Sequence, residues 1–416
     1  MAPPSSSRSR SGSADPEVAQ GRWHALGQLA VALVLALTTW LSASAVIPQL
    51  RERWDLSDGA AAWLTIAVQL GFVTGAVLSS VLNVADIFSA RRVILAGAAG
   101  AALANAFLGV AGGPEVALPC RFVTGFFLAG VYPPAVKLMS TWFRKGRGIA
   151  IGVLVGAVTV GSATPHLVNG LGGLDWRTVV YVTSALTLLG GITAHAVAEG
   201  PFSFPAAKFD PSQARRVFAN RGVRLASLGY FGHMWELYAM WAWFIVFFGD
   251  YLRAKGLGGS ATPAYATFAV IGIGGLGCWA GGFIGEHWGR TSTSAALMFT
   301  SAACALTIGL LFDAPPWLVL VVACIWGFTV VVDSPLFSTM VTELADQAYV
   351  GTAVTLQLAL GFTLTVATIW LIPVLEAAVG WRWTFAVLAP GPALGALAIL
   401  RLRASPDAAR IAGGRG

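Results

Sequence analysis

The stretch GFFLAGVYPPAVKLM, residues Gly125–Met139, has a second version later in the chain, GFTVVVDSPLFSTMV, residues Gly327–Val341. The two versions share a glycine, a phenylalanine and a proline, in the pairs Gly125/Gly327, Phe126/Phe328 and Pro133/Pro335. Two further pairs follow at nearly the same offset, Gly148/Gly351 and Trp176/Trp381. Matches in this order indicate an internal duplication, so we expect two halves with one fold.

The composition indicates whether these halves are surrounded by water or by lipid. Of the 416 residues, 56% are hydrophobic and only 11% are charged, against about 25% charged in soluble domains. A chain of this kind is solvated mostly by lipid, which argues against a soluble enzyme. The net charge of +7 comes from short basic clusters between apolar runs, so we expect no nucleic-acid partner. We expect no metal or other cofactor, because no zinc-like cysteine spacing and no Gly-rich phosphate loop is present.

The apolar runs predict membrane helices, each of which needs roughly 20 mainly apolar residues. They lie near residues 27–49, 60–84, 93–113, 115–141, 148–171, 178–198, 225–249, 262–285, 292–312, 316–341, 350–375 and 383–402. We therefore predict an all-α integral membrane protein of twelve transmembrane helices, in two pseudo-symmetric halves of six.

The stretches between the spans set the domain organisation and the orientation. We expect a disordered tail over 1–25, a first half over 26–199, a connector over 200–224, a second half over 225–403 and a tail over 404–416. Most Lys and Arg residues fall on one side if both tails are cytoplasmic, which is the usual arrangement. The first apolar run is long enough to span and remain, so it is not a cleaved signal. We expect a monomer in a bacterial inner membrane.

The loop GGFIGEHWGR, residues Gly281–Arg290, is similar to the acidic–x–x–Gly–Arg loop of the major facilitator superfamily of secondary transporters. The first half carries LNVADIFSARR at the same site, with one extra residue and without the glycine. The resemblance covers nearly the whole chain after residue 25 and implies the major facilitator fold. It also implies charge latches between helices, made by Asp86, Arg91, Arg92, Glu286, Gly289 and Arg290. The alternative is that these arginines are only positive-inside anchors.

Within the superfamily, VQLGF (Val68–Phe72) and VGTAVTLQLALGF (Val350–Phe362) look most like bacterial permeases grouped with nitrate/nitrite and cyanate carriers. Nitrate itself is disfavoured, because the spans 60–84 and 262–285 lack the arginines that such carriers use. Drug exporters carry glycine followed directly by proline in the fifth helix. Three residues separate Gly161 from Pro165 here, which weakens the exporter interpretation.

Two polar residues near the middle of the seventh span are the strongest site candidates. Glu236 lies twelve residues beyond Arg224, about 18 Å along a helix and so near mid-membrane. His233 shares its face, and Met240 and Trp243 continue a stripe that we expect to line a central cavity. Polar groups at this depth normally serve a cavity or a partner, so we expect Glu236 to carry a coupling proton. The alternative is a buried structural network.

Other candidates can each be interpreted in two ways. Asp333 lies beside Pro335 in a predicted helix kink and suits proton coupling or an interhelical hydrogen bond, and its repeat counterpart lies beside Tyr132. Arg121 suits an anionic solute or a structural ion pair. The remaining substrate candidates are polar or aromatic groups that could equally be packing residues, namely Gln69, Gln357, His166 and Trp40.

The sequence thus predicts a transporter that moves a small organic anion or polar metabolite by alternating access, with proton-coupled uptake favoured. Proton-driven efflux of drugs or metabolites is the first alternative. Copper import is disfavoured, because Met234 and Met240 lie six residues apart and so on different helix faces. A sensor of transporter shape is also disfavoured, because the connector is short.

Overall fold

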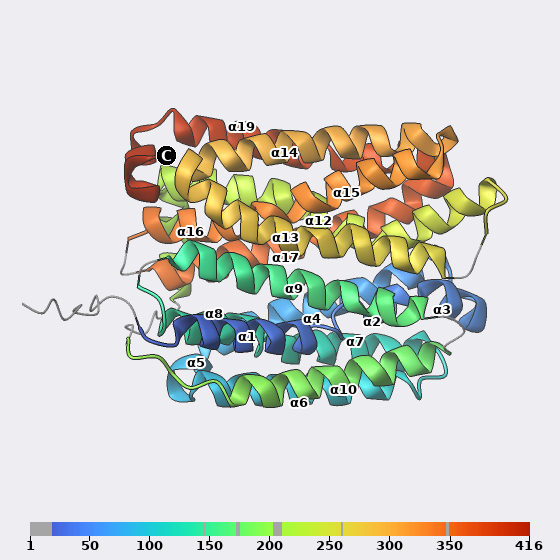
Figure 1. Ribbon diagram of the computed structural model, residues 1–416, viewed down its shortest axis with the longest axis horizontal. Helices are drawn as coiled ribbons and strands as arrows, with labels where there is room; N and C mark the ends of the chain where they lie inside the picture. The colour runs from blue at the N-terminus through green and yellow to red at the C-terminus, as the bar shows by residue number, and fades with distance from the viewer. Residues whose placement is uncertain (1–18, 145, 172–174, 203–209, 259–260, 347–348) are drawn as a thin grey trace, which may run out of the picture.

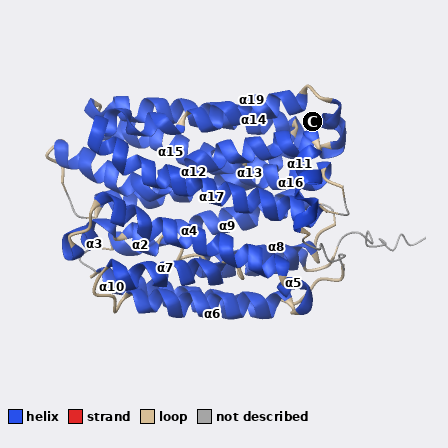
Figure 2. Ribbon diagram, turned by 180° about the vertical axis from the view of Figure 1, so that it is seen from behind, coloured by secondary structure: helices blue, strands red, loops and turns tan. Residues whose placement is uncertain are grey.

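The computed structural model describes residues 19–144, 146–171, 175–202, 210–258, 261–346 and 349–416. These residues form helices joined by short turns, and no strand occurs among them (Figures 1 and 2). Most of the predicted N-terminal tail and part of the connector lie outside the described ranges.

The two predicted halves lie one above the other, with their helices running along the long axis (Figure 1). The first half contains α1 (Arg22–Ala36), α2 (Ser42–Ala45), α3 (Ile47–Trp54), α4 (Asp58–Val81), α5 (Val84–Ile87), α6 (Ala90–Leu108), α7 (Pro114–Leu128), α8 (Tyr132–Ser140), α9 (Arg147–Gly170) and α10 (Trp176–His195). The connector contains η1 (Pro211–Gln213) and α11 (Ala214–Ala219). The second half contains α12 (Arg221–Ala254), α13 (Thr262–Trp288), α14 (Arg290–Thr307), η2 (Ile308–Asp313), α15 (Pro316–Val332), α16 (Ser334–Leu344), α17 (Val350–Val379), α18 (Trp381–Thr384), η3 (Phe385–Leu388) and α19 (Pro390–Arg403). The chain ends in η4 (Pro406–Arg410) and η5 (Ala412–Gly414).

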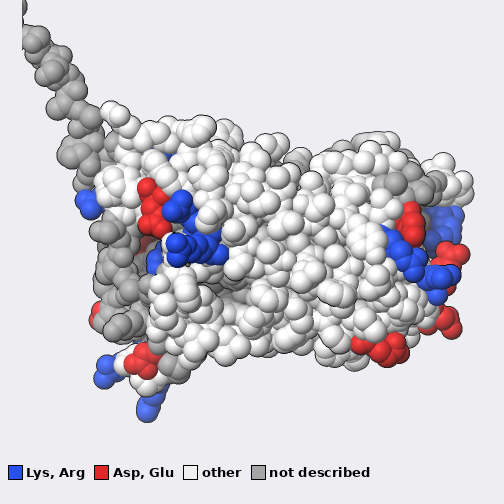
Figure 3. Space-filling view, turned by 90° about the horizontal axis from the view of Figure 1, so that it is seen from below, with Lys and Arg blue, Asp and Glu red and all other residues white. Residues whose placement is uncertain are grey.

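The helices confirm the predicted spans. In the described residues, 10 helical stretches are long and apolar enough to cross a membrane. The other two predicted spans are the broken first helix, α1 to α3, and the long helix α12. Charged side chains gather at the two ends of the molecule, and the surface between them is nearly free of charge (Figure 3). An uncharged band between two charged ends is what a lipid bilayer requires.

Several of the predicted spans are broken, and in the fourth and the tenth the break follows from proline. Proline cannot donate to the helix ladder, so a helix bends or restarts where it occurs. The fourth span is divided between α7 and α8 by Pro133, and the tenth between α15 and α16 by Pro335. These are the repeat-related kinks that the sequence predicted. The first span breaks over residues 37–41, where no proline is present.

The duplicated glycines allow the same close helix–helix contact in each half. A Cβ atom added to Gly125 on α7 would lie 2.0 Å from the carbonyl oxygen of Val68 on α4. A Cβ atom added to Gly327 on α15 would lie 1.8 Å from the carbonyl oxygen of Val270 on α13. Only a residue without a side chain allows two membrane helices to approach this closely. The duplication therefore preserves a backbone contact between the second and fourth helix of each half.

Gly327→Ala is expected to destabilise the protein by about 3 kcal/mol or more, because the two helix backbones must move apart. The matched control is Gly272→Ala on α13, where the nearest atom to the new Cβ would be 4.0 Å away. Alanine is a better helix former than glycine, so the control is expected to be neutral or stabilising by up to about 1 kcal/mol. Thermal unfolding of both purified variants checks this. Equal melting temperatures would contradict the close contact.

Candidate functional site

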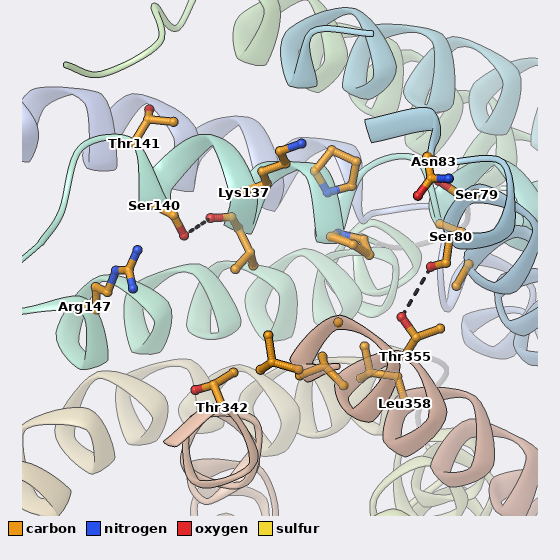
Figure 4. Close-up of a pocket in the computed structure, with 18 of the residues that line it drawn as sticks. Ser79, Ser80, Asn83, Lys137, Ser140, Thr141, Arg147, Thr342, Thr355 and Leu358 are labelled. Atoms are coloured by element: carbon orange, nitrogen blue, oxygen red, sulfur yellow. Dashed lines mark hydrogen bonds between the residues drawn. The ribbon is translucent and has the colours of Figure 1, made fainter. Parts of the chain in front are cut away.

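A cavity of about 700 Å³ lies between the two halves, at the end of the bundle that carries the C-terminus. The first half lines it from α4 and α8 and the second half mainly from α17. Its polar lining consists mostly of hydroxyl and amide groups, with two cations and one carboxylate: Ser79, Ser80, Asn83, Lys137, Ser140, Thr141, Arg147, Glu199, Thr342 and Thr355 (Figure 4). The hydroxyl oxygens of Ser80 and Thr355 lie 3.3 Å apart in a hydrogen bond that joins the halves.

Four aromatic rings lie deeper between the halves. Ala76 and Leu358 line the cavity, and one helical turn beyond them stand Phe72 on α4 and Phe362 on α17. Their ring centroids are 4.8 Å apart. Trp40 and Tyr238 complete this four-ring cluster: Trp40, Phe72, Tyr238 and Phe362, all buried. The cluster contains two rings from each half, so it closes the space between the halves at mid-depth.

Trp40 was predicted from the sequence, but the other three rings of the cluster were not. A signal for two of them was present. The segments Val68–Phe72 and Val350–Phe362 each contain a glutamine and end in Gly-Phe. The glutamines are Gln69 and Gln357, and the Gly-Phe pairs are Gly71-Phe72 and Gly361-Phe362. Their pairing across the halves depends on the antiparallel approach of α4 and α17, which a single sequence does not reveal.

Glu236 is buried on α12 and accepts two hydrogen bonds from neutral donors. Its Oε1 accepts from Trp326 Nε1 on α15 at 2.6 Å, and its Oε2 accepts from Ser301 Oγ on α14 at 2.7 Å. In the described part of the chain it forms no ion pair. Glu236 thus faces two helices of its own half, whereas the sequence placed it on a stripe toward the interface. A carboxylate is stable in this interior only where such donors reach it.

His233 and Asp333 form a second buried polar contact, which joins α12 to the kink between α15 and α16. His233 Nδ1 lies 2.9 Å from Asp333 Oδ1, and both side chains are nearly inaccessible to solvent. The other ring nitrogen of His233 has no hydrogen-bond partner among the described residues. The two sequence candidates therefore lie together, one helical turn from Glu236.

Arg121 is fully buried on α7, and each nitrogen of its guanidinium donates to the protein. Its three nitrogens donate to five uncharged acceptors at 2.5 to 3.3 Å. The acceptors are the carbonyl oxygens of Thr39, Trp40 and Leu64, the Ser42 hydroxyl and the Asn105 side-chain oxygen. Two of these carbonyls are released where the first span breaks: that of Thr39 also accepts from Ser42, and that of Trp40 would otherwise lack a partner. The break without proline is explained by this side chain.

The amide and imidazole candidates are buried without partners. Gln69, Gln357 and His166 have no exposed surface. Among the described residues, neither amide atom of either glutamine and neither ring nitrogen of His166 has a hydrogen-bond partner. Buried polar groups are normally satisfied, so these exceptions mark a place where a further molecule can bind.

The remaining substrate candidates are packed into the bundle. Met240 is fully buried on α12. Trp243 Nε1 donates to the carbonyl oxygen of Ile369 on α17 at 2.9 Å, so its polar atom is already used. Tyr132 opens α8 at the kink after α7 and is half-buried against the core.

The latch candidates of the second half lie at the cavity end. Arg290 forms an ion pair with Glu343 on α16, a partner that the sequence did not predict. The carboxylate of Glu286 reaches the other half, because a Cβ atom on Gly148 of α9 would lie 2.7 Å from its Oε1. Gly289 has φ +87°, which favours glycine, and a side chain there would also meet the carbonyl oxygen of Arg415 at 2.5 Å.

The latch candidates of the first half make fewer contacts. The side chain of Asp86 lies outside the described residues. Arg91 and Arg92 lie in the first turn of α6. Arg92 is exposed, and Arg91 has a buried Nε without a partner in the described part of the chain. The carbonyl oxygen of Arg91 is 3.5 Å from a ring nitrogen of His195.

Comparison with known proteins gives a consistent result. The sequence profile of the Major Facilitator Superfamily matches residues 29–369. The puromycin resistance protein of Streptomyces alboniger is 32% identical over 173 residues, which are 40% of this chain and 34% of that protein. The tetracenomycin C resistance and export protein of Streptomyces glaucescens is 25% identical over 253 residues, which are 60% and 44% of the two chains. The chain therefore spans less than half the length of these relatives.

Solved structures show the same fold at low sequence identity. A D-xylose–proton symporter superposes with a TM-score of 0.73 and 14% identity, covering 91% of this chain and 97% of its own. The nucleoside transporter NupG superposes with a TM-score of 0.68 and 15% identity, covering 91% of this chain and 99% of its own.

Proposed function

The chain belongs to the Major Facilitator Superfamily, and on this basis we propose that it moves a small polar solute by alternating access, coupled to protons. The observation that carries the proton coupling is Glu236, a buried carboxylate held at mid-membrane by two neutral donors. Acidic groups inside a membrane span are costly and commonly lie on proton or substrate paths. The cavity and the four-ring cluster between the halves support a solute path at the interface.

The hydrogen bonds of Glu236 indicate which oxygen takes the proton. The indole Nε1 of Trp326 can only donate, so Oε1 must remain an acceptor. The Ser301 hydroxyl can reverse and accept, so Oε2 can be protonated without loss of either hydrogen bond. We therefore assign the proton to Oε2. Protonation removes a charge from the membrane interior at no cost in hydrogen bonds, which suits repeated loading and release.

The contact between His233 and Asp333 links proton occupancy to helix geometry. Asp333 lies at the point where α15 ends and α16 begins, and His233 lies on α12. When His233 is protonated the two form an ion pair, and when it is neutral the attraction weakens. A change in proton occupancy therefore alters the force between α12 and the kink. Such a biased two-state element is what alternating access needs.

The solute that the geometry favours is polar but uncharged. The expectation of an organic anion rested on Arg121, whose nitrogens all donate to protein acceptors. Gln69 and Gln357 are among the buried groups whose amide atoms have no hydrogen-bond partner in the described residues. Amide groups bind donors and acceptors alike without a net charge.

Two directions of transport remain candidates. Uptake is favoured by the separation of Gly161 from Pro165, which departs from the exporter pattern. Efflux is favoured by the relatives, which are named as resistance and export proteins. The same names give no support to a grouping with nitrate/nitrite and cyanate carriers. The latch role of Glu286, Gly289 and Arg290 is retained as part of the proposal, together with Asp86, Arg91 and Arg92.

We further propose an inner-membrane monomer with both termini in the cytoplasm. The positive-inside distribution of Lys and Arg supports this orientation. The cavity then faces the cytoplasm. Labelling of cysteines introduced at either end, with a reagent that does not cross membranes, tests the orientation in intact cells.

Transport itself is tested in two steps. A thermal-shift screen of small polar metabolites on purified protein identifies a ligand, because binding to the folded state raises apparent stability. Uptake of that ligand into proteoliposomes is then measured under imposed proton gradients of both directions. Accumulation that follows the gradient in one direction supports the proposal and assigns uptake or efflux. A ligand that binds but never crosses the membrane would identify a sensor.

A further inference from the structure

Polar atoms without partners gather around the four-ring cluster, from both halves. They belong to five side chains that are at most 2% exposed, namely Trp40, Gln69, His166, Trp241 and Gln357. In the described part of the chain their indole, amide and imidazole atoms form no hydrogen bond within the protein. Each such atom destabilises the fold unless something satisfies it. Several of them beside one cluster of a membrane protein indicate a shared partner.

The spacing along the helices places these side chains around one region. Gln69 precedes Phe72 by three residues and so shares the face of α4 that meets the second half. Trp40 belongs to the cluster itself, and the ring of Trp241 lies 5.4 Å from that of Tyr238.

Gln357 borders the same region, and His166 lies farther along α9. Gln357 follows Val354, which lines the cavity, by three residues on α17. His166 precedes Asn169 by three residues on α9, and Asn169 donates to a carbonyl of the broken first span. Gln69, Gln357 and the two indoles therefore border the cavity or the cluster, whereas His166 lies toward the far end of α9 from the cavity-lining Arg147.

The charged groups beside the four-ring cluster already contact other protein groups, whereas Lys137, Arg147 and Glu199 line the adjoining cavity. Each nitrogen of Arg121 donates to a protein acceptor. Glu236 accepts from two donors, and His233 contacts Asp333. An ionised solute held between the rings of the cluster would thus lose its water and gain no opposite charge there, which is strongly unfavourable.

The aromatic rings indicate the shape of the solute. Trp40 of the first half and Tyr238 of the second stack at 5.9 Å with an angle of 27° between their planes. When the halves separate, this stacked pair must part, and each ring face is then free for a flat partner. Aromatic stacking of this kind stabilises a bound planar ring. The nearby cavity of about 700 Å³ is within the usual range for small-molecule sites.

We propose that the solute is an uncharged molecule with a flat ring system that carries both hydrogen-bond donors and acceptors. This inference rests on the proposed transport function and names the substrate class of its central site. The rings of the four-ring cluster bind the faces of the solute. Gln69 and Gln357 bind its edge from opposite halves, with the indole groups as additional donors.

Calorimetric titration of the full-length protein in detergent tests this class with three probes. Hydroxycoumarin is flat, uncharged in mildly acidic buffer, and carries a donor and acceptors. Its carboxylate derivative adds a charge to the same ring, and inositol is uncharged and polar but not flat. Hydroxycoumarin is expected to bind at least about tenfold more tightly than either of the others. Equal or tighter binding of the carboxylate or of inositol overturns the inference, as does the absence of binding by all three.

Gln69→Leu and Gln357→Leu provide a second readout that a packing role would not give. Each is expected to weaken hydroxycoumarin binding by about three- to tenfold, because one or two hydrogen bonds are lost. Each is also expected to raise the melting temperature of the ligand-free protein by about 2–4 °C, because an unsatisfied buried amide is removed. Gln213→Leu on the connector is the matched control, with unchanged binding. A fall in melting temperature for both site variants would show structural amides and overturn the assignment.

The two hypotheses can fail separately. Titration in detergent, without a membrane gradient, reports only on the site. If the three probes fail but a different solute is driven into proteoliposomes by a proton gradient, the substrate class is wrong and the transport function stands. If hydroxycoumarin binds as expected but is never transported under either gradient, the site is correct and the transport function is wrong.

Discussion

Arg121→Leu is expected to prevent stable folding, with a loss of about 3 kcal/mol or more of unfolding free energy. The leucine would leave the carbonyl oxygen of Trp40 without a donor at the break in the first span, and that of Thr39 with Ser42 as its donor. In the membrane interior no water can replace the guanidinium. The break also positions Trp40 in the four-ring cluster, so we expect the substitution to disturb the packing between the halves as well.

Arg121→Lys is the informative companion. Lysine keeps the charge but has only one nitrogen that can donate. The five acceptors are arranged around the three nitrogens of a planar guanidinium. We expect a lower melting temperature and a broadened elution profile in fluorescence-detected size-exclusion chromatography. If both variants fold with the parental melting temperature and lose only the binding of an anion, Arg121 belongs to a substrate site and the structural account is wrong.

Glu236→Gln is expected to abolish gradient-driven accumulation and to leave the fold intact. The amide oxygen can accept from Trp326, and the amide nitrogen can donate to the reversed Ser301 hydroxyl, so the variant imitates the protonated carboxyl. It cannot release a proton. A gradient of about one pH unit supports about a tenfold concentration ratio for one proton per solute. We expect this ratio to fall to unity.

Exchange of labelled for unlabelled solute across proteoliposomes, without a gradient, is the control for Glu236→Gln. Exchange needs alternating access but no net proton movement, so it is expected to persist. The accumulation ratio of Ser301→Ala is expected to lie between that of the parent protein and that of Glu236→Gln. The variant keeps the carboxyl group but removes the hydroxyl that accepts from a protonated Oε2. Undiminished accumulation by Glu236→Gln would exclude Glu236 as the coupling group.

The fold was predictable because it depends on local sequence patterns. Apolar runs of spanning length gave the helices, and the repeated Gly125/Gly327 and Pro133/Pro335 pairs gave the two halves with their kinks. The break in the first span was not predictable. It depends on Arg121, which approaches from α7 and is remote in sequence from the carbonyls that it satisfies.

The site was predictable only in part, for the same physical reason. Rare polar residues in apolar spans are conspicuous, so Glu236, His233 and Asp333 could be selected from the sequence. Their partners could not be selected, because Ser301 and Trp326 are unremarkable residues that become informative only once α14 and α15 pack against α12. The residue types of the site are thus visible in sequence, whereas their neighbours are a product of packing.

Reversible cross-linking of the two halves tests alternating access most directly. Ser80 and Thr355 come from opposite halves, and their hydroxyl oxygens lie 3.3 Å apart. In a background without Cys120, Cys278, Cys304 and Cys324, the double variant Ser80→Cys/Thr355→Cys can be oxidised to a disulfide, with each single variant as control. We predict that oxidation stops solute exchange in proteoliposomes, that reduction restores it, and that the single variants are unaffected. Exchange that continues in the fully cross-linked protein would contradict transport by movement of the two halves.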